Sequence, residues 1–369
     1  MADFIEQFTA KGYGCLRDVT ARLTPLHAFI GPNDSGKSTL LRGIRTVLQL
    51  AGEGFSKGEG GFEPFDPGIS PSNVPGLELS AKHGRWTYWV IGQATGRGLV
   101  ERVAPSGVSR ERSHESGVTS TRPWPPEARE HVPLWKGDGA VLPAFADDVR
   151  PGARLLRLDP DALRAPSSLI AGGGRVQLYN ERGNGLAGIY DVILNRHLDG
   201  YIAIRDDLRR LFPGVQTFGL ENVSESEKEL RVQLLPGDWI PARFVSEGLL
   251  YYLAFAAIRF LDPASVLLIE EPENGLHPAR IAEVIAILRE ISKTTQVLLA
   301  THSPLVINEL APEEVTVVTR SPEQGTKLTP MVETANFEKR SSVYALGELW
   351  LSFADGVAET ALLHGRDGQ

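Results

Sequence analysis

Cysteine is nearly absent from this chain, which has a single one, Cys15, among 369 residues. One cysteine cannot form an internal disulfide, which fits the reducing cytoplasm. Long hydrophobic runs are also missing, because the longest, Gly248 to Ile258, falls far short of the roughly 20 residues of a membrane-spanning helix. The first ten residues carry two acidic side chains and no basic one, which argues against a secretory signal. We therefore expect a cytoplasmic protein with no membrane partner.

An excess of basic residues is missing as well. The chain has 38 Lys and Arg against 46 Asp and Glu, so its formal net charge is −8. This balance provides no general attraction to nucleic acid, and any contact with DNA must be local. Internal repeats and long heptad runs are absent too, which excludes a solenoid and a coiled-coil arm. Hydrophobic residues make up 42% of the sequence, enough for a globular protein with a buried core.

The spacing of hydrophobic residues predicts an α/β fold. Apolar residues recur at helical spacing in some segments and at alternate positions in others. The expected elements are, in order, strands within 3–30, a helix over 38–50, a β-meander over 77–103, a strand over 154–158, helices within 188–211, strands near 216–220 and 230–235, and then helix, strand, helix and strand over 248–260, 265–270, 278–292 and 296–300. Two stretches rich in Gly, Pro, Ser or Arg, 51–75 and 104–133, predict exposed loops.

Residues 31–39, GPNDSGKST, match the phosphate-binding pattern G-x-x-x-x-G-K-[ST] between a predicted strand and a predicted helix. The glycines let backbone N–H groups wrap a phosphate, and the helix N-terminus adds partial positive charge. In this pattern Lys37 reaches the β- and γ-phosphates, and the Ser38 hydroxyl binds Mg²⁺. Asp34 adds a carboxylate, so we predict left-handed backbone there with the side chain pointing outward. A chance match in a glycine-rich chain is the alternative, and the strand–helix setting argues against it.

Two carboxylates, Glu270 and Glu271, end the apolar strand that begins at Ser265. The carboxyl ends of strands form the ligand edge of an α/β sheet, so we expect both side chains there. Glu270 is then a Mg²⁺ ligand, through water, and Glu271 is the general base that polarises the attacking water. An acidic turn after a core strand is the alternative.

Two further motifs follow the same logic. Residues 301–303, Thr-His-Ser, end the last predicted strand, and we expect His302 to hydrogen-bond the γ-phosphate or the attacking water. A loop histidine without a role is the alternative. Residues 246–248, Ser-Glu-Gly, begin the apolar helix 248–260, and Ser-x-Gly at a helix N-terminus suits an anion. A plain N-cap explains this motif as well, so the order of the whole set must decide.

That order resembles an ABC-type ATPase head. The segments GPNDSGKSTLL, IEEPENGLHP and ATHSP are similar to those of the RecF, SMC and OLD-like predicted ATPases, which are often catalogued as AAA-type. The resemblance covers about 1–50 and 240–310. It is weaker over 150–240, where LLRLDPDALRAPS is similar to a segment of the same ATPases. It implies an α/β P-loop NTPase of ABC-ATPase type, with a mixed central sheet, an antiparallel β-subdomain and a helical signature lobe.

Carried over by position, the resemblance implies a site for ATP and Mg²⁺ that hydrolyses ATP. The ATP-binding residues are then Gly31, Asn33, Ser35, Gly36, Lys37, Ser38 and Thr39, with Ser246 and Gly248 of the signature motif contacting the ATP of the opposite subunit. The metal ligands are Ser38 and Glu270, and the catalytic residues are Lys37, Glu271 and His302. Residues 274–277 match the D-loop. The signature reads VSEG rather than LSGG, which puts the sandwiching of nucleotide between two subunits in doubt.

Two roles of the family pattern have no single candidate. A Q-loop residue is sought among Gln93, Gln177 and the Asp159 segment. An adenine-stacking group is sought in Tyr13 or Arg17. The order of motifs leaves both roles open.

The resemblance also implies an organisation and a kind of partner. We expect a composite head over about 1–325, with a nucleotide lobe (about 1–170 and 260–325), a signature lobe (about 171–259) and a C-terminal extension over 326–369. The residues after His302 are too few for the TOPRIM domain of OLD nucleases. We therefore expect a homodimer that acts on an effector nuclease, another protein in trans or DNA, in repair or antiviral defence. An ATPase subunit of a transport or regulatory complex is the alternative.

Two segments leave their roles open. The apolar helix predicted within 343–363 either docks on the chain's own core or binds a partner. A set of arginines around the β-meander belongs either to a solvated loop or to a contact with the DNA backbone. These are Arg97, Arg102, Arg110, Arg112, Arg122 and Arg129.

Overall fold

The computed structural model describes residues 4–52, 77–83, 86–92, 98–104, 108–113, 117–123, 152–335, 337–341 and 343–354. The chain divides into two compact units, each described here by itself. The first unit comprises Met1–Arg154, Ala264–Leu268 and Ser292–Gln369, and the second comprises Leu155–Pro263 and Ile269–Ile291. The boundary therefore passes through strands β9 (Ala153–Leu156) and β14 (Val266–Glu270).

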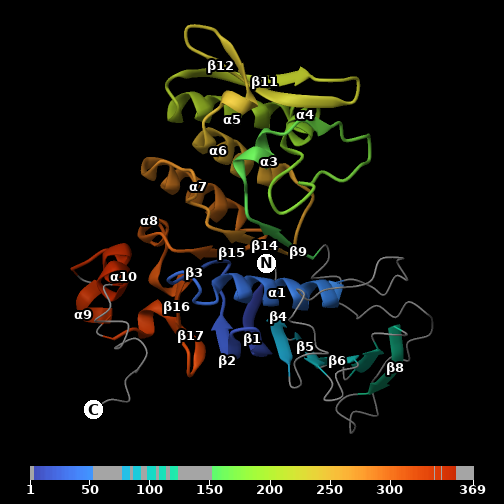
Figure 1. The fold of residues 1–369 in the computed structure, drawn as a ribbon, viewed down its shortest axis with the longest axis vertical. Helices are drawn as coiled ribbons and strands as arrows, with labels where there is room; N and C mark the ends of the chain where they lie inside the picture. The colour runs from blue at the N-terminus through green and yellow to red at the C-terminus, as the bar shows by residue number, and fades with distance from the viewer. Residues whose placement is uncertain are drawn as a thin grey trace. The chain divides into compact units, whose positions relative to one another are not determined.

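An antiparallel sheet of seven strands belongs to the first unit, in the order β2-β1-β4-β5-β6-β7-β8 (Figure 1). Phe8, Ala10, Leu79 and Val90 are fully buried on one face, because alternate residues of a strand point the same way. The strands are β1 (Ile5–Tyr13), β2 (Leu16–Arg22), β4 (Glu78–His83), β5 (Trp86–Gly92), β6 (Gly98–Ala104), β7 (Val108–Ser113) and β8 (Gly117–Pro123).

Strands β7 and β8 correct one prediction from the sequence, which expected an exposed loop over 104–133. Their sequences, VSRERS and GVTSTRP, are polar and carry almost no apolar alternation. They form because β6 offers a free edge: Val103 pairs with Val108, and β8 pairs in turn with β7. Pairing to an existing sheet outweighs weak local propensity. The arginine side chains of this region, the predicted loop from residue 53 onward and Gln93 lie outside the residues whose side chains are described.

A mixed sheet of six strands forms the centre of the fold, in the order β17-β16-β3-β15-β14-β9. Strands β3 (Leu26–Ile30) and β15 (Gln296–Thr301) are parallel and buried at every residue, as strands covered on both faces are. Strand β16 (Val315–Ser321) is parallel to β3 and antiparallel to β17 (Gly325–Pro330). Helix α1 (Lys37–Gly52) packs against β15 and also against β1, β4 and β5, so it lies between the two sheets of the first unit.

The C-terminal helix α10 (Leu346–Ala354) docks on the first unit itself. It packs against α8 (Pro304–Asn308), where the Gly347 N–H donates to Asn308 Oδ1 at 2.7 Å. A Cβ on Gly347 would lie 2.5 Å from the Pro304 carbonyl oxygen, so only glycine allows this approach. Leu349 and Trp350 are buried. Of the two alternatives for this helix, docking on the chain's own core is the one observed. The short helix α9 (Phe337–Ser341) precedes it.

The second unit surrounds one apolar helix, α6 (Glu247–Ala257), which is buried at every residue from Leu249 to Ala257. Helices α3 (Pro160–Arg164), α4 (Leu186–Arg196) and α7 (Pro278–Ile291) pack on it, and Tyr190 donates to the Leu253 carbonyl oxygen at 2.8 Å. Helix α5 (Leu198–Leu211) packs on α4 and β11. The small antiparallel sheet consists of β10 (Ser167–Ser168), β12 (Glu227–Leu234) and β11 (Val215–Asn222), with β13 (Trp239–Pro241) paired to β12.

These features confirm the predicted fold class. The mixed central sheet, the antiparallel β-subdomain and the helical lobe around α6 are all present. Within the described part of the chain, no helix has both the length and the apolar character needed to cross a bilayer.

Candidate nucleotide site

The loop 31–36 connects the buried strand β3 to helix α1 in the geometry of an anion cradle. Gly31 and Gly36 have no room for a side chain, because a Cβ on Gly31 would overlap the Val318 carbonyl oxygen and one on Gly36 would overlap Thr326 Oγ1. Gly36 also has a φ of 109°, which other residues adopt only with strain. Lys37 is buried, and its Nζ donates to the carbonyl oxygens of Gly31 and Pro32 at 2.8 and 2.7 Å. The ammonium group thus lies against the loop that it is predicted to serve.

Two residues of the loop show that an anion fits it. Asp34 has a φ of 62° and an exposed side chain, so its carboxylate is accommodated as predicted, in left-handed backbone. Ser35 Oγ is buried, and no hydrogen bond is made to it by the described residues. A buried hydroxyl without a partner is costly, and a phosphate oxygen would satisfy it. Asn33 is exposed, whereas Ser38 and Thr39 are half-buried on the first turn of α1.

His302 leaves the central sheet beside the loop. Thr301, the last residue of β15, pairs with Ile30, the last residue of β3, so His302 and Gly31 are the next residues on neighbouring parallel strands. His302 is exposed, and the N–H of Ser303 donates to Thr301 Oγ1 at 2.9 Å, which fixes the turn. The first unit therefore brings the loop and this histidine to one edge of the sheet.

Glu270 and Glu271 begin the corresponding part of the second unit. Glu270 is buried, and its Oε1 has no hydrogen-bond partner among the described residues. Glu271 has a φ of 50°, an unusual conformation for a residue other than glycine, and its Oε2 accepts a hydrogen bond from Asn274 Nδ2 at 2.6 Å. Such backbone outliers persist at functional sites. An unsatisfied buried carboxylate oxygen and a serine hydroxyl are ligands that suit Mg²⁺.

The predicted signature and D-loop meet within the second unit. Ser246 occupies the N-cap position of α6, is exposed, and makes no capping hydrogen bond with its side chain, so a plain cap does not explain it. A Cβ on Gly248 would lie 3.0 Å from the Gly275 carbonyl oxygen. Gly275 in turn has a φ of 66° and leaves room for the Tyr251 ring, whose Cε2 would lie 2.5 Å from a Cβ there. The two glycines let the first turn of α6 contact the D-loop backbone.

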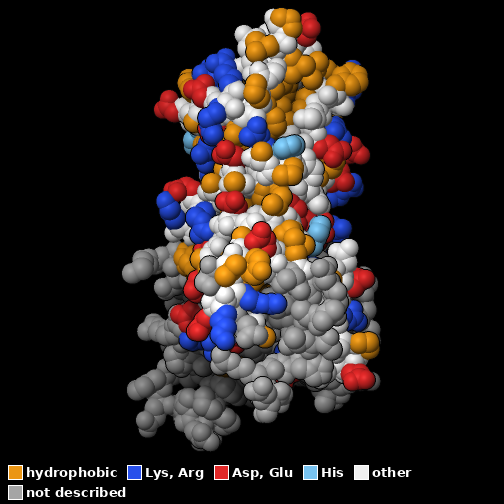
Figure 2. All heavy atoms as spheres, turned by 90° about the vertical axis from the view of Figure 1, so that its left-hand side faces the viewer, with side chains coloured by type: hydrophobic (Ala, Val, Ile, Leu, Met, Phe, Trp, Pro, Cys, Tyr) orange, Lys and Arg blue, Asp and Glu red, His pale blue; other side chains and the backbone are white. Residues whose placement is uncertain are grey.

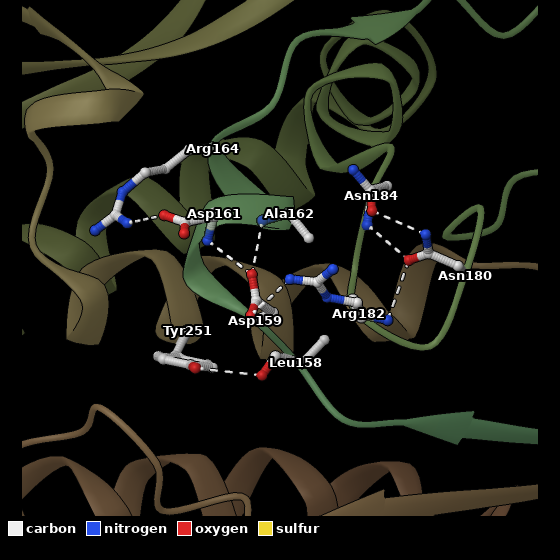
Figure 3. Close-up of polar contacts among 9 residues, drawn as sticks. All are labelled: Leu158, Asp159, Asp161, Ala162, Arg164, Asn180, Arg182, Asn184 and Tyr251. Carbon is white, nitrogen blue, oxygen red and sulfur yellow. Dashed lines mark hydrogen bonds and ion pairs between the residues drawn. The ribbon is translucent and has the colours of Figure 1, made fainter.

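A segment that sequence reasoning described only as a strand and a linker, 157–164, also belongs to this arrangement (Figure 3). Asp159 caps α3, accepting from the N–H groups of Asp161 and Ala162 at 3.0 and 3.1 Å, and pairs with Arg182 at 3.0 Å. Burial acts to raise the pKa of Asp159, but the hydrogen bonds from Arg182 and the helix N–H groups lower it. An Asp followed by Pro at the first helical position is a helix start signal, so the sequence did contain α3.

The candidates for adenine stacking fare unequally. Tyr13 is buried in the core, with its hydroxyl 3.4 Å from Thr46 Oγ1, so neither face of its ring is exposed. Arg17 is exposed, and its guanidinium donates to the carbonyl oxygens of Glu323 and Pro322 in the β16–β17 turn. Gln177 is half-buried in the second unit. The described residues therefore offer Arg17, and not Tyr13, to a ligand.

Figure 2 shows hydrophobic side chains gathered on the surface of the second unit, next to Lys and Arg side chains. Exposed large hydrophobic residues of this unit include Leu198, Leu235, Trp239 and Phe244. Two of them lie under arginines: Arg231 is 5.9 Å from the Trp239 ring centroid, and Arg243 is 5.1 Å from that of Phe244. Phe244 precedes the signature by two residues.

Comparison with known proteins gives one family match. The family model described as "AAA domain, putative AbiEii toxin, Type IV TA system" matches residues 26–308, which contain every predicted site residue. An OLD nuclease of Thermus scotoductus is 43% identical over 44 residues, which are 12% of this chain and 8% of that protein. The match to that nuclease is therefore local.

Solved structures of SMC heads have a similar fold. A head bound to the C-winged helix domain of ScpA has a TM-score of 0.53 at 18% identity, and the match covers 88% of this chain and 97% of that one. A head with an extended coiled coil, bound to the C-terminal domain of ScpA from Pyrococcus furiosus, has a TM-score of 0.51 at 15% identity, covering 94% and 99%. At these identities the likeness concerns the fold.

Proposed function

This chain belongs to the AAA-domain family whose model matches residues 26–308, and we propose that it binds ATP with Mg²⁺ and hydrolyses it. One observation carries the proposal. The loop 31–36 is a glycine cradle that ends on the N-terminus of α1, with a buried lysine against its carbonyl groups and an unsatisfied buried hydroxyl at Ser35. Backbone N–H groups, a helix N-terminus and an ammonium group together suit the β- and γ-phosphates of a nucleotide.

The hydrolytic roles follow from the chemistry of each side chain. Ser38 and Glu270 would hold Mg²⁺, which, when bound, neutralises charge on the phosphates. Glu271 accepts a proton from the attacking water, and Asn274 orients its carboxylate through the 2.6 Å hydrogen bond. His302 donates or accepts a hydrogen bond at the γ-phosphate or at this water. The sheet order supports this grouping, because β3, β15 and β14, whose ends carry these residues, are consecutive.

Hydrolysis further requires a second copy of the chain in this proposal. Ser246 and Gly248 stand at the N-terminus of α6, where helix N–H groups suit an anion. Since the side chain of Ser246 is exposed and does not cap its own helix, it can serve the γ-phosphate of the ATP held by a facing subunit. We propose that ATP thereby joins two heads, and that hydrolysis separates them.

The output is proposed to be DNA-related. The similarity to an OLD nuclease covers 44 residues, and the fold is that of SMC heads. We propose that the ATP-dependent dimer drives or gates an effector nuclease, or DNA itself, in repair or antiviral defence. Capture of the native protein from its source distinguishes this from the alternative: a bound nuclease or DNA supports it, and membrane permease subunits would contradict it.

Lys37→Ala tests the proposed ATP site. Removing the ammonium group should abolish binding of a fluorescent ATP analogue, with the fold unchanged by circular dichroism, because Lys37 supplies the positive charge nearest the phosphates. Lys339→Ala, on the short helix α9, is the matched control and should bind as the unmodified protein does. Unchanged binding by Lys37→Ala would remove the loop from the proposal.

A further inference from the structure

Residues 157–164 contact both functional ends of the second unit. At one end, Arg157 Nε lies 3.8 Å from Glu270 Oε2, and Glu270 is the proposed Mg²⁺ ligand. At the other end, an Nη atom of Arg164 donates to the carbonyl oxygen of Val245 at 3.3 Å, one residue before the signature Ser246. Both contacts lie within one compact unit. A single short segment thus joins the residue that serves the subunit's own ATP to the residue that serves the ATP of the facing subunit.

The segment is rigid, so a displacement at one end reaches the other. Its backbone pairs with the following loop, through Arg157 N to Glu181 O at 2.8 Å and Asp159 N to Arg182 O at 3.0 Å. The Asp159 carboxylate caps α3 and pairs with Arg182, and Arg164 is held by Asp161 at 2.9 Å (Figure 3). Packed, hydrogen-bonded elements move as units rather than deforming continuously.

Tyr251 makes a third connection at the middle of the segment. Its hydroxyl donates to the Leu158 carbonyl oxygen at 3.2 Å, as Figure 3 shows. Its ring lies against Gly275 of the D-loop, where a Cβ would be 2.5 Å from Cε2. Burial raises the pKa of Tyr251, so the hydroxyl remains a donor. The signature helix, the D-loop and the segment 157–164 therefore share one side chain.

We propose that residues 157–164 couple the two half-sites of one subunit, with Arg157, Arg164 and Tyr251 as positioning residues. The proposal rests on the proposed function. Arg157 is the counter-charge of Glu270, a buried carboxylate with one unsatisfied oxygen. When Glu270 holds Mg²⁺, its attraction for Arg157 weakens, because the divalent cation already neutralises the carboxylate. Arg157 is then released, the segment shifts, and Arg164 and Tyr251 carry the shift to Val245 and to the first turn of α6.

Hydrogen exchange of the full chain, at a concentration where sedimentation shows monomers, tests the coupling without requiring hydrolysis. Adding ATP and Mg²⁺ to the unmodified protein should protect residues 31–39 and also change exchange over 243–250 by about fivefold, the lower end of typical coupling between sites. In Arg164→Met the protection of 31–39 should remain and the change over 243–250 should be lost. Tyr251→Phe, which removes only the hydroxyl, should reduce that change.

The controls separate this inference from the proposed function. Arg196→Met, on an exposed arginine at the end of α4, should respond as the unmodified protein does. An unmodified response over 243–250 in both Arg164→Met and Tyr251→Phe overturns the coupling, as does protection of 31–39 without any change over 243–250. Absence of protection at 31–39 in the unmodified protein instead rejects the ATP site itself, and the coupling with it.

Discussion

The hydroxyl of Thr326 donates a hydrogen bond to the carbonyl oxygen of Ser35, with 2.8 Å between the two oxygens, across 291 positions of sequence. The Thr326 N–H also donates to the Cys15 carbonyl oxygen at 3.1 Å. The phosphate-binding loop is therefore held from outside by β17, in addition to its own helix and strand. The shape of the cradle depends on a hairpin that no loop motif includes.

Thr326→Val tests this support. The substitution keeps the shape of the side chain but leaves the buried Ser35 carbonyl without its donor, which should cost about 1–3 kcal/mol of unfolding free energy. Urea unfolding measures this cost, and titration with a fluorescent ATP analogue should show weaker binding. Thr326→Ser retains the hydroxyl and should restore most of both. Equal stability of the valine and serine variants would show that the hydrogen bond is unimportant.

Glu271→Gln separates ATP binding from hydrolysis. Glutamine can still accept the hydrogen bond from Asn274 but cannot take a proton from water, so the rate should fall by about 100- to 10,000-fold, the usual contribution of a general base. The ATP-bound dimer should then accumulate. Phosphate release and sedimentation with ATP and Mg²⁺ measure the two effects, with Glu225→Gln in the exposed β11–β12 turn as control. A Glu271→Gln protein that stays monomeric contradicts the facing dimer.

Ser246→Arg tests the contribution of the signature. The side chain is exposed and makes no capping hydrogen bond, so the change in unfolding free energy should stay within about 0.5 kcal/mol. The bulky cation should prevent the close approach of a facing subunit, so hydrolysis should stop while ATP binding at Lys37 continues. Ser246→Ala, which stays small, should retain dimerisation. Full hydrolysis by the arginine variant would place the signature outside the site.

His27 should make stability depend on pH. Burial lowers the pKa of His27 from 6.5 to about 4, against a smaller opposing effect of the Glu314 charge, and its ring nitrogens lie 3.1 and 3.0 Å from the hydroxyls of Thr24 and Thr316. Below pH 6.5 the unfolded chain binds a proton that the folded chain does not. Stability is therefore complete above pH 6.5 and falls as the pH drops towards 4, by about 3 kcal/mol for this residue.

Urea unfolding at several pH values between 4 and 7 measures the dependence on pH. The slope should be smaller in His27→Gln, since glutamine does not titrate. The exposed His197→Gln is the control and should keep the full slope. Identical slopes in the His27 variant and the unmodified protein would assign the acid sensitivity to other groups.

Local chemistry explains what the sequence alone determined. The P-loop, the paired glutamates and Thr-His-Ser are short motifs in which residue type, spacing and the adjoining strand or helix all depend on neighbours in the chain. The left-handed backbone at Asp34 was predictable for the same reason, because it depends on the conformational preference of a single residue. The fold class followed from the periods of the apolar residues. The start of α3 could have been read at Asp159 and Pro160.

Tertiary structure decided the rest, because the partners lie far apart in sequence. Strands β7 and β8 exist because β6 supplies an edge, and α10 docks because Gly347 admits the Pro304 carbonyl. The hydrogen bond of Thr326 to the P-loop and the contacts of Arg157 and Arg164 join segments that no periodicity relates. A motif specifies which groups meet a phosphate; only the packed fold specifies what holds those groups and what moves when they bind.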